Sequence, residues 1–194
     1  MTYTPKRRYS AVAVLSDDLD RVVLIHKLRP DWQAGKANLP GGKVEAQDIS
    51  TRYYASPGFN WNTLAADEAA SAYRRCAARE LRKETGLDVA VAALQLFCRL
   101  RFKSREGDDA ECCFYAVKGN VDAARTMESE RVFASYVDAL LLGGKAYNFL
   151  PDDQDYWLLA MPNLPYLVAM ARQCLRGEDE AAWPLTVYEA GATP

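Results

Sequence analysis

The chain has 194 residues, the length of one domain, and its 49% hydrophobic residues are enough to bury a substantial core. A formal net charge of −2 argues against broad electrostatic binding to nucleic acid, so an anionic ligand would need a local cation cluster or a metal ion. No run is long enough to span a membrane, and the first residues lack the apolar core of a signal peptide. We therefore expect a single cytoplasmic domain over residues 1–194.

The chain is expected to begin with a hairpin of two strands. Residues 9–15 and 21–28 are rich in β-forming apolar residues, and the polar segment 16–20 between them has turn chemistry. Because the centre of this hairpin is apolar on both faces, it is expected to lie inside a sheet. A loop over residues 29–36 leads to the turn Leu39-Pro40-Gly41-Gly42, whose glycines would let the backbone approach a phosphate or a metal closely.

The next segment, residues 46–66, is rich in aromatic side chains and contains the turn signal Pro57-Gly58. Because disordered segments are poor in aromatic residues, we expect this segment to be ordered. Its aromatic residues are Tyr53, Tyr54, Phe59 and Trp61.

A helix is expected from about residue 67 to residue 85. Apolar residues recur in three- and four-residue steps from Ala69 to Leu81, and Gly86 suits the C-terminal cap. Glu80 and Glu84 are spaced i, i+4 in the last third of this helix, so they lie about one turn apart on the same face. Paired carboxylates of this kind suit Mg²⁺, which prefers oxygen ligands together with the phosphates of its substrate.

The second half of the chain predicts further strands and a late helix. The strands are expected over residues 89–91, 94–102, 111–117 and 130–137. A helical turn at 138–141 and a helix from Pro162 to Leu175, with Asn163 as its cap, should follow. A polar tail from about residue 177 carries Trp183 and Tyr188, which are candidates to pack back on the domain.

The cysteine and histidine content argues against disulfide bonds and zinc. Five cysteines are an odd number and form no Cys-x-x-Cys pair, so we interpret them as reduced, buried small hydrophobic residues. The single histidine, His26, lies in an apolar run and cannot by itself make a His-based zinc site.

The glycine-rich turn and the helix together resemble the Nudix box, G-x5-E-x7-R-E-U-x-E-E-x-G-U, in which U is aliphatic. The matching residues are Gly42, Arg79-Glu80-Leu81 and Glu84-Thr85-Gly86-Leu87. The sequence departs from the pattern in two ways. The arginine stands at position 79 instead of 56, so about 23 residues are inserted, and Lys83 occupies the first position of the Glu-Glu pair.

The resemblance extends over roughly residues 9–175 and implies an α/β/α sandwich with a mixed sheet. It also implies hydrolysis of a diphosphate bond in a nucleoside diphosphate linked to another group, with Mg²⁺ as cofactor and Mn²⁺ as an alternative. Glu80 and Glu84 would be metal ligands, together with the backbone carbonyl of Gly42, and Arg79 would orient a carboxylate. Family members often form dimers, so a homodimer is an open alternative to a monomer.

A late acidic residue often completes such a site as a ligand or as an activator of water. Glu130, at the head of its strand, is the first candidate, Glu128 the second and Glu111 the third. Asp48 stands near the position of the first glutamate of the box and is a weaker candidate to support the helix or the metal. Glu45 has the alternatives of a role near the site or a turn contact with Lys43.

Several cationic and aromatic residues are candidates for substrate binding. Arg29, Lys36 and Lys43 flank the glycine-rich turn and could meet phosphates, whereas Trp32 and Trp61 could stack on a nucleobase or pack in the core or a lid. The ammonium of Lys83 would either contact a substrate phosphate as a point charge or pair with Glu80 and leave fewer metal ions in the site.

The sequence leaves the substrate open among ADP-ribose-like, coenzyme A-like and nucleoside triphosphate compounds. We expect a small nucleotide partner, no membrane and no sequence-specific nucleic acid. Two alternatives to a hydrolase remain. One is a non-catalytic Nudix module that binds a nucleotide, and the other is a Nudix-fold isomerase of an allylic diphosphate, which would need a cysteine in its pocket.

Overall fold

The computed structural model describes residues 5–51, 60–61, 64–148, 156–177 and 183–188 of the chain. Within them a mixed ten-stranded sheet has the strand order β10-β5-β6-β1-β2-β3-β9-β8, with β4 paired to β1 and β7 paired to β2. The strands are β1 (Arg7–Leu15), β2 (Arg21–His26), β3 (Lys36–Asn38), β4 (Gly41–Lys43), β5 (Gln95–Lys103), β6 (Asp109–Lys118), β7 (Val132–Tyr136), β8 (Lys145–Asn148), β9 (Tyr156–Ala160) and β10 (Leu185–Tyr188).

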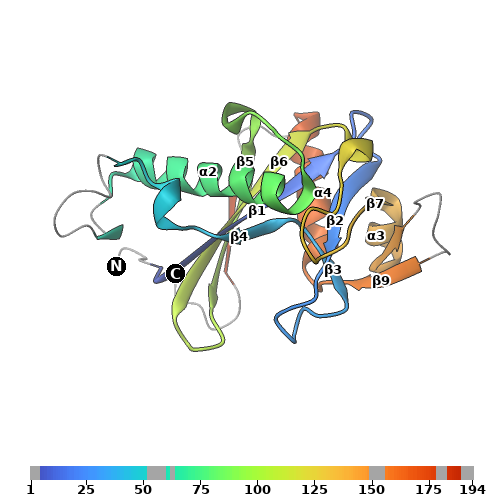
Figure 1. Cartoon of the computed structure of the whole chain (residues 1–194), viewed down its shortest axis with the longest axis horizontal. Coiled ribbons are helices and arrows are strands. Elements are labelled where there is room, and N and C mark those ends of the chain that lie inside the picture. Colours follow the sequence, from blue (N-terminus) through green and yellow to red (C-terminus); the bar gives the residue numbers. More distant parts are fainter. Residues whose placement is uncertain (1–4, 52–59, 62–63, 149–155, 178–182, 189–194) are drawn as a thin grey trace.

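Helices cover both faces of this sheet. Helix α2 (Ala66–Thr85) lies on one face, while α3 (Val137–Gly143) and α4 (Leu164–Arg176) belong to the other layer (Figure 1). Short 3₁₀ helices are η1 (Ala46–Asp48), η3 (Val91–Ala93) and η4 (Val121–Ala123). This arrangement confirms the α/β/α sandwich with a mixed sheet.

The central strand β1 explains why the sheet carries two separate cores. Successive side chains of a strand point to opposite faces, so Val12 and Val14 pack with α2, whereas Ala13 and Leu15 pack with α4. All four are fully buried, which is why the sequence is apolar on both faces here. The five cysteines are also buried and free, as expected.

The two strands of the expected hairpin pair with each other only next to the turn. Strands β1 and β2 pair antiparallel at Leu15 and Val22. Over the rest of its length β1 pairs in parallel with β6, while β2 pairs antiparallel with β7. The polar turn of residues 16–20 is therefore correct, but the two strands diverge from it toward different neighbours.

Three local expectations differ from the structure. The glycines at 41 and 42 lie in the short strand β4 instead of a turn, because Gly41 and Gly42 pair with Ala11 and Ser10 of β1. No strand forms over the expected residues 89–91, and a 3₁₀ helix begins at Val91. Asn163 stands at the start of α4, but its side chain accepts no capping hydrogen bond.

The expectation that the tail packs back on the domain is confirmed. Trp183 packs against the core, Tyr188 contacts Arg101, and the tail contains β10, which pairs in parallel with β5.

The aromatic insertion is only partly described. It begins with η1, and Ser50 and Trp61 also lie within the described residues, whereas Tyr53, Tyr54, Phe59 and the predicted Pro57-Gly58 turn lie outside them. Among the helices that the structure describes, none combines the length and the apolar character needed to cross a membrane.

Candidate functional site

Helix α2 presents two carboxylates to the short strand β4. Its apolar face, which includes Ala77 and Leu81, packs on the sheet, and Glu80 and Glu84 are carried along the same side. Both glutamates are buried, with 6% and 7% of their surface exposed. Since a buried carboxylate is costly unless it is paired or hydrogen-bonded, the contacts of these two side chains indicate what the site is built to hold.

Backbone groups of β4 lie directly against the two carboxylates. The N–H of Gly41 donates a hydrogen bond of 2.7 Å to Oε2 of Glu84. A Cβ atom at Gly42 would lie 2.6 Å from Cδ of Glu80, and the carbonyl of Gly42 accepts from the thiol of Cys76 at 3.8 Å. The absence of a side chain at Gly42 is therefore what lets Glu80 approach this strand, whereas the absence of one at Gly41 lets the strand lie close to β1.

Alanine substitutions at the two glycines should have different effects. At Gly41 the new Cβ would lie 2.3 Å from the backbone oxygen of Ser10, so Gly41→Ala should lower the melting temperature strongly. At Gly42 it would meet only the side chain of Glu80, so Gly42→Ala should fold, with a smaller thermal shift, and lose affinity for divalent cations. Thermal unfolding and Mn²⁺ titration of both variants would measure this, and equal thermal losses would contradict it.

Arg79 is fixed by the buried carboxylate of Asp48. Its Nε and one terminal nitrogen donate to the two oxygens of Asp48, each at 2.8 Å, and the same terminal nitrogen donates to the Lys43 carbonyl at 3.1 Å. The hydrogen bonds from Arg79 to Asp48 are the main cause that raises the pKa of this guanidinium above its ordinary value. The other terminal nitrogen is paired with Glu80. Arg79 thus orients Glu80 from a position that Asp48 sets.

Lys27 lies between Glu84 and a second acid, Glu130. Its Nζ is 2.6 Å from Oε2 of Glu130 and 3.6 Å from Oε1 of Glu84. The other oxygen of Glu130 accepts from the N–H of Leu28 at 3.2 Å. Burial raises the pKa of Glu84 to about 7; Glu80 and Glu130 act in the same direction, and Lys27 and the Gly41 N–H oppose them.

Lys83 has two acidic partners on the outer side of the helix. Its Nζ is 3.3 Å from Oε1 of Glu128 and 3.8 Å from Oε2 of Glu80, and its side chain is half exposed. Glu80 is the leading cause that raises the pKa of the Lys83 ammonium above its ordinary value. Of the two alternatives for Lys83, this geometry corresponds to the pairing with Glu80.

Acidic side chains outnumber the lysines in this group. When all four carboxylates are ionised, they and the two ammonium groups carry a net charge of −2, and the Arg79–Asp48 pair is neutral. Oxygen donors from Glu80, Glu84 and the Gly42 carbonyl are the type that Mg²⁺ prefers. Among the described residues no group of three or more His, Cys, Asp or Glu side chains is arranged as a metal cluster. The four carboxylates are Glu80, Glu84, Glu128 and Glu130.

A family model described as the NUDIX domain matches residues 6–145, which is well over half of the chain. The chain belongs to the Nudix family. No curated protein matches it.

Solved structures of Nudix proteins share the fold at low sequence identity. A MutT/nudix family protein from Enterococcus faecalis has a TM-score of 0.57 at 13% identity, covering 94% of this chain and 68% of the other. The NUDIX domain of Shewanella oneidensis NrtR, complexed with ADP ribose, has a TM-score of 0.54 at 13% identity and covers 89% and 90%. Shewanella oneidensis NrtR complexed with a 27mer DNA has a TM-score of 0.55 at 12% identity and covers 88% and 62%.

The Nudix box is therefore assembled in space although the sequence splits it. The insertion leaves from Asp48 and returns at the start of α2, and Asp48 still contacts Arg79 from the other side of the gap. Glu45 is exposed, and its nearest contact with Arg79 is 3.9 Å. The break in the motif thus does not separate Gly42 from Glu80 and Glu84.

Two of the predicted site residues lie elsewhere. Glu111, the third candidate for the late acid, lies on β6 and pairs with Arg101 at 3.0 Å and with Arg99 at 3.6 Å. Trp61 holds the guanidinium of Arg8 over its ring at 4.7 Å. These contacts gather near the N-terminal half of α2, so the structure does not bring either residue together with Glu80 and Glu84.

The other substrate-binding candidates lie on segments next to Lys27 and on β4. Arg29 and Trp32 follow Lys27 between β2 and β3, Lys36 begins β3, and the N–H of Gly35 donates to the Lys27 carbonyl at 2.9 Å. Trp32 is half exposed, and its carbonyl accepts from Lys36 Nζ at 2.8 Å. Lys43 is exposed at the end of β4. These residues remain predictions for substrate binding.

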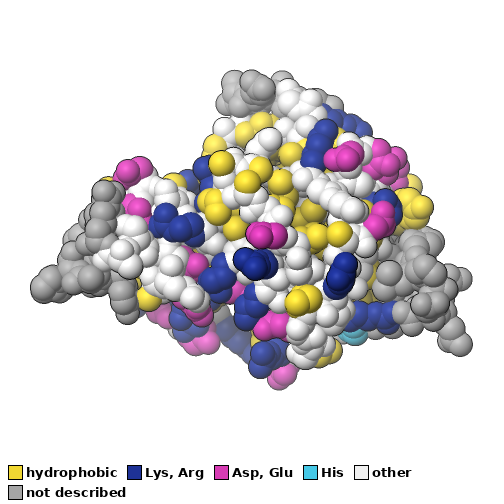
Figure 2. Space-filling view, turned by 45° about the horizontal axis from the view of Figure 1, so that its top comes forward, with side chains coloured by type: hydrophobic (Ala, Val, Ile, Leu, Met, Phe, Trp, Pro, Cys, Tyr) yellow, Lys and Arg dark blue, Asp and Glu magenta, His cyan; other side chains and the backbone are white. Residues whose placement is uncertain are grey.

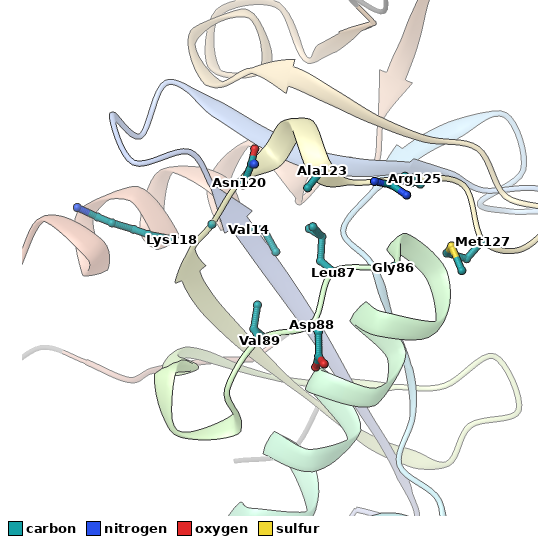
Figure 3. A pocket seen from close by; sticks show the side chains of 11 residues that line it. Val14, Gly86, Leu87, Asp88, Val89, Lys118, Asn120, Ala123, Arg125 and Met127 are labelled. Carbon is teal, nitrogen blue, oxygen red and sulfur yellow. The ribbon is translucent and has the colours of Figure 1, made fainter.

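A cavity of about 560 Å³ lies at the C-terminal end of α2, beside the box (Figure 3). Figure 3 shows its wall formed by the end of α2, by β1 and by the segment that follows β6. It includes Gly86 and Leu87 of the box but neither Glu80 nor Glu84. The N–H of Met127, which borders it, donates to the Glu84 carbonyl at 3.3 Å, so the cavity and the carboxylates share the last turn of the helix.

The sequence reasoning missed the role of Lys27. The residue stood at the end of a predicted strand without any motif, and its partner Glu130 is 103 positions away. The available signal was the pairing of β2 with β7, since Ile25 lies opposite Val132 in an antiparallel register. Two residues further along each strand, this register places Lys27 opposite Glu130.

Proposed function

We propose that this Nudix protein is a hydrolase that uses a divalent cation to cleave the diphosphate of a nucleoside diphosphate derivative. One observation carries the proposal. Two buried carboxylates on one turn of the box helix, Glu80 and Glu84, face a backbone segment without side chains at Gly41 and Gly42. The net negative charge around them needs a cation for balance.

Mg²⁺ bound there would neutralise charge on the diphosphate and lower the pKa of the attacking water. Glu80 and Glu84 would hold the cation with the Gly42 carbonyl. Arg79 fixes the orientation of Glu80, and the Gly41 N–H together with Lys27 fixes that of Glu84. These contacts pre-organise the two carboxylates before substrate arrives, which lowers the reorganisation that catalysis requires.

Glu130 is the proposed late acid, and its contacts favour an electrostatic role over direct proton transfer. Both of its oxygens are engaged, one with Lys27 and one with the Leu28 N–H. Glu128 contacts Lys83 and lies nearer the solvent. We therefore assign Glu130 to positioning Lys27 beside Glu84.

The proposed substrate carries a nucleotide, and ADP-ribose is the first compound to test. The NUDIX domain of NrtR, which binds ADP ribose, is matched over 90% of its length, whereas the DNA-bound NrtR chain is matched over 62%. Figure 2 shows basic and acidic side chains mixed over the face it presents, without a broad basic surface. The mixed charge of this face favours a small nucleotide over DNA as the partner.

The test is an assay of ADP-ribose, coenzyme A and nucleoside triphosphates with Mg²⁺, with Mn²⁺ and with EDTA. Monophosphate products separated by chromatography would be measured for each compound. We expect turnover of at least one compound, lost in EDTA and restored by either metal. Nucleotide binding by calorimetry without turnover under all metal conditions would instead support the non-catalytic module, which the pairing of Lys83 with Glu80 favours as the second candidate.

The isomerase alternative has less support from the structure. Cys76 is near the box, since its thiol donates to the Gly42 carbonyl, but burial raises its pKa to about 12. A neutral buried thiol is a poor nucleophile. Cys76→Ala should therefore retain diphosphate hydrolysis.

A further inference from the structure

Two ammonium groups are built into the carboxylate site from different parts of the chain. Lys27 comes from the end of β2 and bridges Glu84 and Glu130, whereas Lys83 comes from α2 itself and bridges Glu80 and Glu128. Glu84 and Glu80, the two candidate metal ligands, are thus each linked through one lysine to an acidic residue of the segment that precedes β7. Each lysine therefore lies between two carboxylates.

The position of Lys27 is fixed by its surroundings. Its side chain is 14% exposed, and the side chains of Glu84 and Glu130 are 9% and 12% exposed. A hydrated point charge such as an ammonium is buried only where partners replace its water. Glu130, the closer partner of Lys27, is in turn held by the Leu28 N–H, which keeps the ammonium next to Glu84.

This ammonium occupies the place where a second metal ion would have to bind. A cation that bridged Glu84 and Glu130 would need the same oxygens, Oε1 of Glu84 and Oε2 of Glu130, that Lys27 contacts. In two-metal sites the ions are about 3.5–4 Å apart and share carboxylates in this manner. On the other side of Glu80, Lys83 repels a further cation in the same way.

We propose that Lys27 and Lys83 substitute for additional metal ions, so that the site takes a single divalent cation at Glu80, Glu84 and the Gly42 carbonyl. The inference rests on the proposed function and specifies its metal requirement. The monovalent lysines supply part of the positive charge that other ions would bring, and they do so without dissociating.

The test counts bound Mn²⁺ per chain by electron paramagnetic resonance of the free ion, in the absence of nucleotide. The wild-type protein should bind one ion. Lys27→Met frees Glu84 and Glu130, and Lys83→Glu adds an acid beside Glu80 and Glu128, so each variant should bind two. Lys118→Met, which removes an exposed lysine at the cavity beside the box, should still bind one.

The two variants keep the proposal testable if one fails to fold. Lys27 is buried, so Lys27→Met should melt at a lower temperature in EDTA and recover in Mn²⁺, whereas the half-exposed Lys83 tolerates exchange. A wild-type protein that binds two or more ions, or folded variants that both bind only one with unchanged affinity, would overturn the proposal. A wild-type protein that binds none would refute the proposed function itself, and the two failures are therefore distinct.

Discussion

Glu84→Gln is expected to lower kcat/KM for the substrate that the wild-type protein hydrolyses by on the order of 10³-fold. The exchange removes the charge of a ligand but keeps its size and its acceptor for the Gly41 N–H. Losing several kcal/mol of charge stabilisation in the transition state corresponds to a rate loss of about this order. Steady-state kinetics at saturating Mg²⁺, with circular dichroism to verify the fold, would measure the effect.

Asp67→Asn is the matched control, because Asp67 is an exposed acid in the first turn of the same helix. Its kcat/KM should stay close to that of the wild-type protein. If Glu84→Gln kept wild-type turnover, the assignment of the metal site would be wrong. If both variants lost activity equally, the loss would come from the charge or stability of the helix as a whole.

The same Glu84→Gln variant should be more stable than the wild-type protein at neutral pH when no metal is present. The pKa of Glu84 rises from 4.5 to about 7 on folding, chiefly because of burial. An acid whose pKa is raised in the folded state stabilises that state at low pH, and this stability is lost as the pH rises from about 4.5 to 7. At about 1.36 kcal/mol per pKa unit the loss is about 3 kcal/mol, and a glutamine side chain, which does not ionise, would not undergo it.

Urea unfolding in EDTA at about pH 5 and about pH 8, on either side of this window, would test the expectation. The free energy of unfolding of the wild-type protein should fall relative to that of Glu84→Gln as the pH rises. Saturating Mg²⁺ should reverse the order of the two proteins at the higher pH, because the cation binds the ionised carboxylate. Equal pH dependence of the two proteins in EDTA would contradict the raised pKa of the buried Glu84.

The sequence predicts α2 and its carboxylates because every local signal agrees there. The helix is marked by its apolar period, by the acids in its first turn and by Gly86, which takes the left-handed conformation at its end. The i, i+4 spacing then places the two glutamates on the same face. Strand β10 could not be predicted in this way. It has only four residues, all exposed, too few for a reliable pattern in a tail that is otherwise polar, and its pairing with β5 makes it a strand.

The sequence predicts which carboxylates lie on α2 better than it predicts which residues surround them. Lys27 reaches Glu84 only because the register of β2 with β7 brings it opposite Glu130, and such registers depend on the packing of the whole sheet. The anchoring of Arg79 by Asp48 was hidden for a similar reason, since the insertion separates these two residues in sequence. Charge partners from distant segments, therefore, were the part of the site that motif reasoning could not provide.

The described ends of the insertion contact the rest of the domain at several points. Asp48 is held by Arg79, the N–H of Ser50 donates to Glu68 at 2.8 Å, and Trp61 packs against Arg8. The Asp48 contact lies in the C-terminal half of α2, where Arg79 also pairs with Glu80, so it couples the first end of the insertion directly to the box. A foreign loop grafted into the insertion could therefore reshape selectivity without disturbing the two glutamates only if it kept Asp48 in place.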